Sequence, residues 1–136
     1  MAPSAEKATI SKVRILVFGG TRFLGRAIVE IALARGHALT LFHRGRSNAS
    51  LWPEAEHVIG DRETELHRLE KRTFDAVIDT SAFEVFTVRK AARAVGAVPY
   101  IFVSSISVYE DAARMGEGDP VQSVDDAEHA TLEMGR

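Results

Sequence analysis

Three glycines and an arginine stand between a run of apolar residues and an amphipathic segment near the start of the chain. The stretch reads ILVFGGTRFLG, from Ile15 to Gly25. Glycines at a turn from a strand into a helix let the backbone approach a phosphate closely, and free N–H groups at the helix start bind the anion. Arg22 adds a cation whose planar donors suit phosphate. The stretch therefore predicts a site for a dinucleotide diphosphate, lined by Gly19, Gly20, Thr21, Arg22, Phe23, Leu24 and Gly25.

A basic cluster follows the apolar segment 38–43. Dinucleotide-binding proteins that select NAD place a carboxylate at this position, on the ribose 2′-hydroxyl. In this sequence His43, Arg44 and Arg46 stand there instead. A carboxylate would repel a 2′-phosphate, whereas an arginine can pair with it, at about 1.5 to 3 kcal/mol for a charged hydrogen bond. The sequence therefore predicts NADP(H) in preference to NAD(H). The alternative is that these are solvated loop charges.

Alternating apolar and amphipathic segments must position these residues. Short apolar runs predict strands at 13–18, 38–43, 57–60, 74–79 and 100–104, and the segments between them predict helices at 23–35, 63–71 and about 85–96. Short connections favour parallel pairing through right-handed crossovers. We therefore predict an α/β fold: a Rossmann-type open parallel sheet of order 3-2-1-4-5, with helices on both faces and the ligand crevice at the carboxyl ends of the strands.

The helical segments also predict which side chains face the sheet. In 23–35 the apolar positions that recur at helical spacing are Leu24, Ala27, Ile28, Ile31 and Ala32, and Gly36 is a natural stop. In the later helix the corresponding positions are Val85, Val88, Ala92 and Val95.

Four stretches resemble the extended short-chain dehydrogenase/reductases, the NAD-dependent epimerase/dehydratase family. Its members typically carry Thr-Gly-Gly-x-Gly-Phe-Ile-Gly at the first turn, and FGGTRFLG is similar, with Arg22 in place of the middle glycine. The other matches are GDR at 60–62, FDAVIDTSAF at 74–83 and IFVSSISVY at 101–109. The resemblance covers residues 13–109.

This resemblance implies roles for residues beyond the glycine turn. Asp61 would face the adenine amino group, and Arg62 beside it would also bind the cofactor. Thr80, Ser81 and Ala82 would line the nicotinamide ribose, and Ser105 would be the active-site hydroxyl. The structural alternatives are a solvated loop aspartate, a strand-end serine and ordinary packing.

The working base of this family is a tyrosine with a lysine four residues later. Here the tyrosines are Tyr100 and Tyr109, and every lysine precedes both. We therefore expect the N-terminal portion of a longer protein, or a truncated gene product, and expect the 136-residue chain itself to be inactive although the parent family is enzymatic. The fifth strand would then be an exposed edge, which favours a homodimer or aggregation.

Length and composition limit the remaining possibilities. A chain of 136 residues with 46% hydrophobic side chains forms one domain with a core of its own. We expect a flexible arm at 1–12, a dinucleotide-binding domain at 13–109, and an irregular acidic tail at 110–136 that leads to a missing C-terminal part. There is no cysteine, the five histidines lack ligand spacing, and no apolar run approaches a membrane span. We expect no metal, no membrane contact and a cytoplasmic location.

Three functions are compatible with these features. The leading hypothesis is the NADP(H)-binding domain of an epimerase, dehydratase or reductase whose small-molecule substrate is a sugar nucleotide or a similar carbonyl compound. GGTRFLG followed by TLFHRG is also similar to the chloroplast stem-loop RNA-binding proteins. However, a net charge of −2 and the lack of an aromatic and basic stripe argue against nucleic acid. A cofactor sensor without catalysis is the third possibility.

Overall fold

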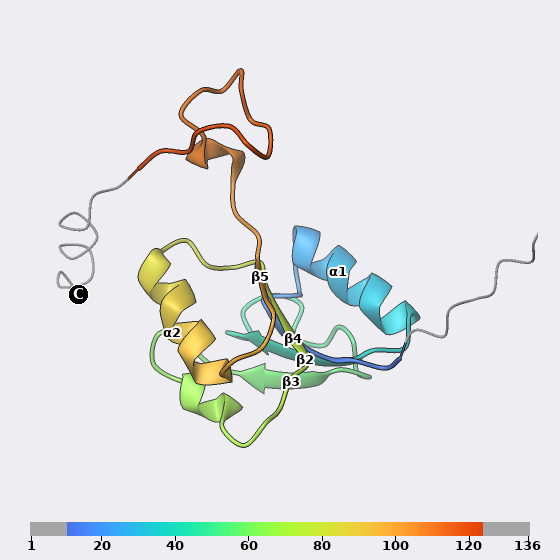
Figure 1. The fold of residues 1–136 in the computed structure, drawn as a ribbon. Coiled ribbons are helices and arrows are strands. Elements are labelled where there is room, and N and C mark those ends of the chain that lie inside the picture. Colours follow the sequence, from blue (N-terminus) through green and yellow to red (C-terminus); the bar gives the residue numbers. More distant parts are fainter. Residues whose placement is uncertain (1–10, 124–136) are drawn as a thin grey trace, which may run out of the picture.

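One parallel sheet forms the centre of the molecule (Figure 1). The structure is a computed structural model that describes residues 11–123. Five strands pair in parallel in the order β3-β2-β1-β4-β5, which confirms the predicted topology. In chain order the elements are β1 (Arg14–Phe18), α1 (Phe23–Ala34), β2 (Ala38–His43), β3 (Glu56–Ile59), a 3₁₀ turn at Leu66–Leu69, β4 (Ala76–Asp79), α2 (Val85–Val95), β5 (Tyr100–Phe102) and a second 3₁₀ turn at Ile106–Val108.

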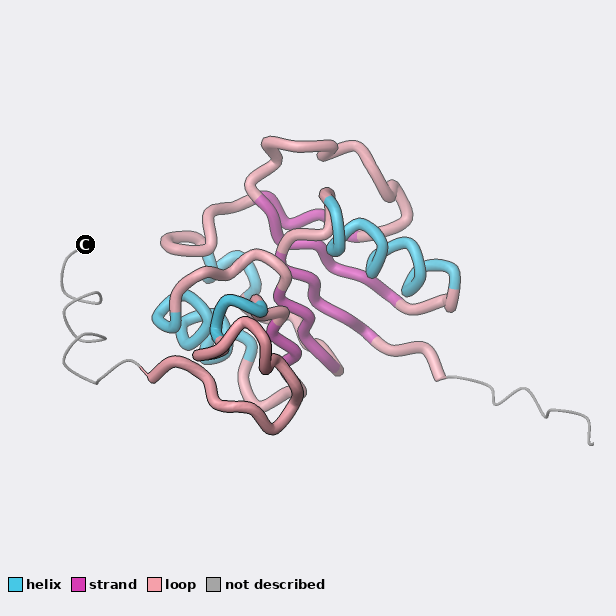
Figure 2. The backbone as a smooth tube through the Cα atoms, turned by 90° about the horizontal axis from the view of Figure 1, so that it is seen from above, coloured by secondary structure: helices cyan, strands magenta, loops and turns pink. Residues whose placement is uncertain are grey.

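Helices cover both faces of the sheet, as predicted. Figure 2 shows α1 on one side of the strands and α2 on the other. Because side chains alternate along a strand, β1 contributes Val17 to the core under α1, and Leu16 and Phe18 to the core under α2. All three are fully buried, as expected of a central strand that is covered on both faces.

The side of α1 that packs on the sheet differs from the predicted one. Gly25, Val29 and Ala32 are buried, whereas Leu24 and Ile31 are exposed. The reason is the close packing of the helix on the first turn: a Cβ at Gly25 would lie 2.8 Å from the backbone nitrogen of Gly20. The glycine packs the helix closely on the turn. Of the apolar positions that periodicity predicts, Ala32 is buried, whereas Leu24 and Ile31 are not.

Three other elements depart from the sequence prediction. The expected helix at 63–71 is only the 3₁₀ turn, because the backbone becomes extended at Glu70 directly after it (φ −55°, ψ 146°). In α2 the fully buried position is Ala91 rather than Ala92, and Val85 is exposed. Strand β5 is two residues shorter than predicted, and residues 103–123 extend away from the sheet (Figure 1).

The predicted terminal segments are described only in part. Residues 110–123 form turns and two isolated bridges, Tyr109 with Val121 and Asp111 with Arg114. Residues 1–10 of the predicted arm and 124–136 of the predicted tail lie outside the described residues.

Replacing Gly25 with alanine tests the contact between α1 and the first turn. Alanine is the better helix former by about 1 kcal/mol, but its Cβ would clash with the backbone of Gly20. Overpacking of this kind costs about 1 to 3 kcal/mol, so Gly25→Ala is expected to lower the free energy of unfolding measured in urea. The control is Gly118→Ala, where nothing lies within 4 Å of the new Cβ. Equal stability of both variants would contradict this packing.

Candidate functional site

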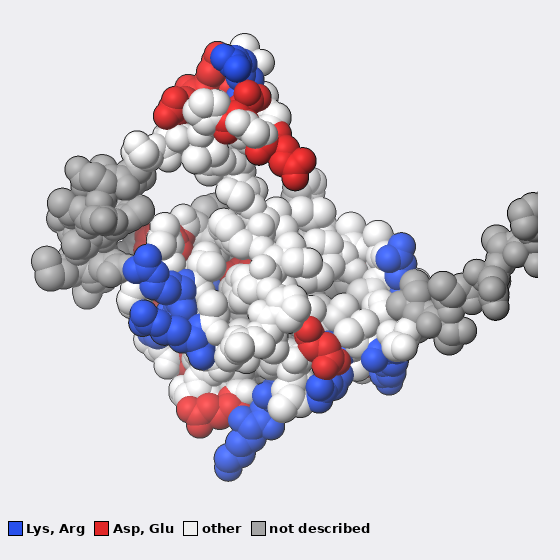
Figure 3. Space-filling model, in the orientation of Figure 1, with Lys and Arg blue, Asp and Glu red and all other residues white. Residues whose placement is uncertain are grey.

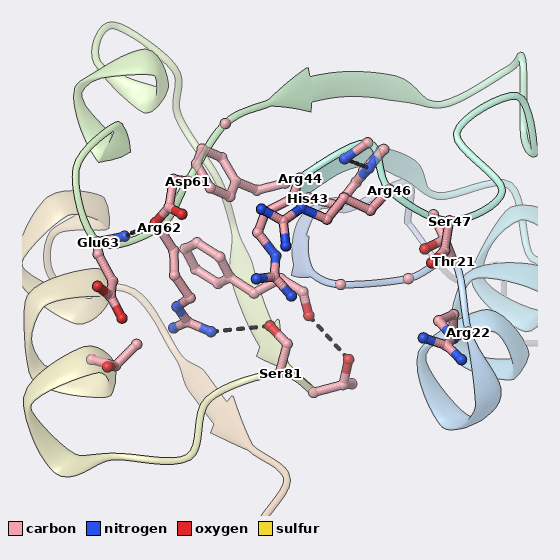
Figure 4. Close-up of a pocket in the computed structure, with 18 of the residues that line it drawn as sticks. Thr21, Arg22, His43, Arg44, Arg46, Ser47, Asp61, Arg62, Glu63 and Ser81 are labelled. Carbon is pink, nitrogen blue, oxygen red and sulfur yellow. Dashed lines mark hydrogen bonds between the residues drawn. The ribbon is translucent and has the colours of Figure 1, made fainter.

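A cavity of about 480 Å³ opens at the carboxyl ends of the strands (Figure 4). It lies near the boundary between β1 and β4, where the strand order reverses, which is the usual ligand position in open α/β sheets. Figure 4 shows four arginines that reach it from three elements: Arg22 from the start of α1, Arg44 and Arg46 from the loop after β2, and Arg62 from the loop after β3. The predicted site residues that line it are Gly19, Gly20, Thr21, Arg22, His43, Arg44, Arg46, Asp61, Arg62, Thr80 and Ser81.

A second, more apolar cavity of about 990 Å³ adjoins the first and shares four lining residues with it, Arg22, Thr80, Phe83 and Glu84. The remaining predicted residues lie here: Phe23, Leu24, Gly25, Ala82 and Ser105. Phe23 and Phe83 stand at its edge almost fully exposed, at 95% and 97%. The sequence therefore identified one set of residues, but the structure divides them between two neighbouring hollows.

The glycine turn depends on contacts that exclude side chains. Gly19 and Gly20 have φ of 99° and 98°, in a region that favours glycine. A Cβ at Gly19 would lie 2.7 Å from the hydroxyl of Thr80, and that hydroxyl donates a hydrogen bond to the carbonyl of Phe18 at 3.0 Å. Thr80 thus joins the end of β4 to the end of β1 directly beneath the turn.

The N-terminus of α1 has a positive potential that no acidic side chain of its first turn neutralises. Arg22 occupies the N-cap without a side-chain capping hydrogen bond, and the first turn of the helix contains no acidic residue. The first N–H groups of a helix lack internal partners and favour an anion. The exposed guanidinium of Arg22 adds to this potential, so the turn is suited to a bound phosphate.

A buried ion pair lies beneath the first cavity, where it holds the lining residue Arg62. The carboxylate of Asp79, at the end of β4, is fully buried and accepts two hydrogen bonds from Arg62, at 2.9 and 2.7 Å. Tyr100 donates a third at 2.6 Å, and the backbone N–H of Ser81 a fourth at 3.1 Å. The guanidinium of Arg62 also lies 4.6 Å from the centre of the Phe18 ring.

The hydrogen bonds keep this carboxylate ionised despite its burial. Burial alone would raise the pKa of Asp79, but the hydrogen bonds from Arg62 and Tyr100 outweigh it and hold the pKa below its ordinary value. Burial and the neighbouring negative charge of Asp79 raise the pKa of the Tyr100 hydroxyl above its ordinary value. Tyr100 is therefore a hydrogen-bond donor in this network and not a base.

The side chains of His43 and Asp61, two of the predicted cofactor-binding residues, already form hydrogen bonds within the protein. His43 as a residue is only 8% exposed. Its Nδ1 accepts the Gly45 N–H at 3.1 Å, and its Nε2 lies 2.8 Å from Nδ1 of His57. Asp61 accepts the N–H of Glu63 at 2.8 Å. Arg44 and Arg46, by contrast, are exposed on the cavity rim.

Ser105, the predicted active-site hydroxyl, lies at the second cavity and is exposed. Its Oγ accepts the N–H of Ser107 at 3.2 Å and lies 2.8 Å from the Ser107 hydroxyl. It therefore caps the 3₁₀ turn 106–108 while it faces the hollow.

Sequence reasoning missed four residues that shape these cavities. Asp79 holds Arg62, Tyr100 donates to Asp79, His57 holds His43, and the side chain of Asn48 donates to the carbonyl of Thr21 at 3.1 Å. The one available signal was Asp79, a charged residue at the end of an otherwise apolar strand.

Replacing Asp79 with asparagine tests the ion pair. The change leaves Arg62 without its counter-charge, and breaking a buried pair costs about 3 to 5 kcal/mol. Urea unfolding near pH 7 is expected to show this loss. Because the folded-state pKa of Asp79 is lowered, its contribution is present above the unfolded pKa and disappears as the pH falls through the folded value. The Asp79→Asn variant should therefore lose less stability than the wild type on acidification.

Asp75→Asn is the matched control, because Asp75 forms an exposed pair with Arg14. Exposed pairs contribute little, so its loss at pH 7 should be clearly smaller. An equal effect of the two substitutions would argue against a special role for the buried pair.

Two classes of feature were not found in the described part of the chain. Residues 11–123 contain no group of three or more histidine or acidic side chains placed to hold a metal ion. None of their helices combines the length and the apolar character that crossing a membrane requires.

Comparison with known proteins places the fold among the epimerases and dehydratases. No family model matches the sequence. A curated protein of Arabidopsis thaliana, the chloroplast stem-loop binding protein of 41 kDa b, is 32% identical over an alignment that covers 73% of this chain and 31% of that protein. The chain thus spans about a third of the length of this relative.

Solved structures agree with the sequence resemblance. A UDP-glucose 4-epimerase from Brucella ovis in complex with NAD has a TM-score of 0.68 and 20% identity, covering 89% of this chain and 45% of that one. An epimerase from Methanothermobacter thermautotrophicus has a TM-score of 0.69 and 18% identity, and the match covers 92% of this chain and 46% of that one. A dTDP-glucose 4,6-dehydratase from Bacillus anthracis in complex with NAD has a TM-score of 0.63 and 19% identity, and the match covers 90% of this chain and 48% of that one. The chain therefore has the Rossmann-type fold of these epimerases and dehydratases and spans about half of their length, so the predicted resemblance is confirmed at the level of the fold.

Proposed function

We propose that this chain forms the NADP(H)-binding domain of an epimerase, dehydratase or reductase that acts on a sugar nucleotide or a similar carbonyl substrate. The observation that carries the proposal is the cavity at the carboxyl ends of the strands, with a glycine turn at its base and three exposed arginines on its rim. Three of the solved structures with this fold are complexes with NAD.

The diphosphate would bind between the glycine turn and the start of α1. The backbone of Gly19 and Gly20 leaves space there that a Cβ would fill, and the helix presents unpaired N–H groups. Arg22 would pair with the diphosphate, a part that is common to NADPH and NADH. Its removal should therefore weaken both cofactors alike.

The 2′-phosphate would bind at the loop after β2. Arg44 and Arg46 are exposed on the cavity rim, and no acidic residue stands between His43 and Ser47 to repel a phosphate. Asp61, on the neighbouring loop, would face the adenine. This arrangement supports NADP(H) over NAD(H) as the preferred cofactor.

The second cavity would hold the nicotinamide end and the substrate. Ser81 and Thr80 lie beside the first cavity and Ala82 and Ser105 beside the second, so these residues form a path from one to the other. A bound nicotinamide would supply hydride transfer there, and the Ser105 hydroxyl would hold the substrate oxygen by a hydrogen bond.

RNA binding is the second candidate, and the name of the curated Arabidopsis relative favours it. The same rim arginines would then contact phosphodiesters. However, in the view of Figure 3 the lysines and arginines form separate groups rather than a continuous stripe, and acidic side chains gather on the loop 110–119. A local anion site fits this charge distribution better than an extended nucleic-acid surface.

The free edge of β5 supports self-association of this chain. Strand β5 pairs only with β4 in the described sheet, and Ile101 and Phe102 on it are 57% and 40% exposed. Unpaired strand edges with apolar side chains pair readily with another strand. We therefore propose a homodimer through β5.

Titration of the purified chain with NADPH and NADH tests the proposed cofactor. The wild type should bind NADPH at least about tenfold more tightly, since one charged hydrogen bond contributes about 1.5 to 3 kcal/mol. Arg44→Ala should reduce this preference by weakening NADPH alone, whereas Arg22→Ala should weaken both cofactors by similar factors. Arg93→Ala on α2, outside both cavities, should change neither.

Equal or tighter binding of NADH would remove the 2′-phosphate argument. Failure of both nucleotides to bind, together with tight binding of a stem-loop RNA whose affinity falls steeply with salt, would favour the second candidate.

The β5 edge is tested by light scattering after gel filtration. Ile101→Lys places a charge on the exposed edge and is expected to shift the chain toward the monomer. Lys90→Glu on α2 is a charge-changing control away from that edge. A wild type that stays monomeric at the highest attainable concentration would rule out this dimer.

A further inference from the structure

Two histidines on neighbouring strands join the two ends of the loop that carries Arg44 and Arg46. The Gly45 N–H donates to Nδ1 of His43 at 3.1 Å, Nε2 of His43 lies 2.8 Å from Nδ1 of His57, and Nε2 of His57 lies 3.1 Å from the carbonyl of Trp52. The connection therefore runs from the start of the loop to a point near its end.

The parallel register of β2 and β3 produces this contact. His57 on β3 pairs with Leu41 on β2, so these two side chains lie on the same face of the sheet. His43 is two residues beyond Leu41 on β2, so the His43 side chain lies on that face as well. The two rings meet edge to face with their centres 5.1 Å apart. The contact is thus built into the sheet and does not depend on the conformation of the loop.

The terminal partners of this chain of hydrogen bonds fix both tautomers. A backbone N–H can only donate, so Nδ1 of His43 must accept and its proton must lie on Nε2. Nδ1 of His57 then accepts that proton, and Nε2 of His57 donates to the Trp52 carbonyl. Every ring nitrogen is satisfied when both rings are neutral. Burial, assisted by the nearby His57, lowers the pKa of His43, which agrees with this assignment.

The loop needs such support because its backbone is unfavourable. Asn48 and Trp52 both have left-handed conformations, with φ of 47° and 60°. This region is costly for a bulky residue such as tryptophan. The carbonyl that His57 holds belongs to Trp52 itself, and Asn48 is tied to the glycine turn through the carbonyl of Thr21 at 3.1 Å.

We propose that His57 is a positioning residue for recognition of the 2′-phosphate: through His43 and Gly45 on one side and Trp52 on the other, it holds the loop in the shape that presents Arg44 and Arg46 to the cavity. The bond to the Gly45 N–H fixes the orientation of the peptide group between Arg44 and Gly45, at the centre of the segment that bears both arginines. This inference rests on the proposed function, and it assigns a role to a residue that lines neither cavity.

Two small nucleotides that differ only in the 2′-phosphate test the inference, adenosine 2′,5′-bisphosphate and AMP. Calorimetric titration is carried out at pH 8, where the phosphates are fully charged. His57→Leu removes both hydrogen bonds and should weaken the bisphosphate about tenfold, as expected from the loss of about 1.4 kcal/mol, while AMP affinity stays within about twofold.

His57→Gln is the rescue variant, because its amide can accept from His43 and donate to Trp52. It should restore most of the preference for the bisphosphate. If His57→Leu does not fold, His57→Ala with added imidazole replaces it, and imidazole should then restore the bisphosphate affinity selectively.

Unchanged preference in His57→Leu, or an equal loss for both nucleotides, would overturn the positioning role. Equal loss would mean that His57 only supports the fold. If the wild type itself does not prefer the bisphosphate to AMP, the proposed 2′-phosphate site fails, and this result is distinct because it appears before any substitution is made.

Discussion

The close approach of three backbone segments beneath the first turn is the constraint on which the rest of the site depends. Gly25 of α1 packs against the backbone of Gly20, and Gly19 packs against the hydroxyl of Thr80 at the end of β4. These contacts set the rotation of α1, bring its N-terminus over the end of β1, and leave the turn open to a ligand. A side chain at any of these glycines would separate the elements whose ends line both cavities.

Charge is distributed in two ways around this framework. At the floor of the first cavity Arg62 is neutralised by the buried Asp79, which Tyr100 and the Ser81 N–H also hold. On the rim, Arg22, Arg44 and Arg46 are exposed to solvent. The buried pair gives shape and rigidity, whereas the exposed cations remain available for an anion. A chain with a net charge of −2 can therefore still attract a phosphate at one place.

The order and types of the elements were predictable because each strand and helix is indicated by a local pattern of residues. Apolar runs and glycine stops located the five strands and two main helices, and short connections implied the strand order.

The rotation of α1 was not predictable from periodicity, since a wide apolar arc does not reveal which of its positions touches the sheet. Gly25 decides that, through a contact with Gly20. The hydrogen-bonded pairs of Arg62 with Asp79 and of His43 with His57 connect different strands and depend on register, which no local pattern contains. The cofactor roles of the residues on the cavity rim remain predictions.

The loop after β2 contains Trp52, the single tryptophan of the chain. Its indole N–H is buried without a hydrogen-bond partner among the described residues, and its backbone carbonyl is held by His57. The emission of an indole responds to the polarity and rigidity of its surroundings. The molecule therefore carries one intrinsic fluorophore in the very loop that bears Arg44 and Arg46, so a rearrangement of that loop is optically visible without a label.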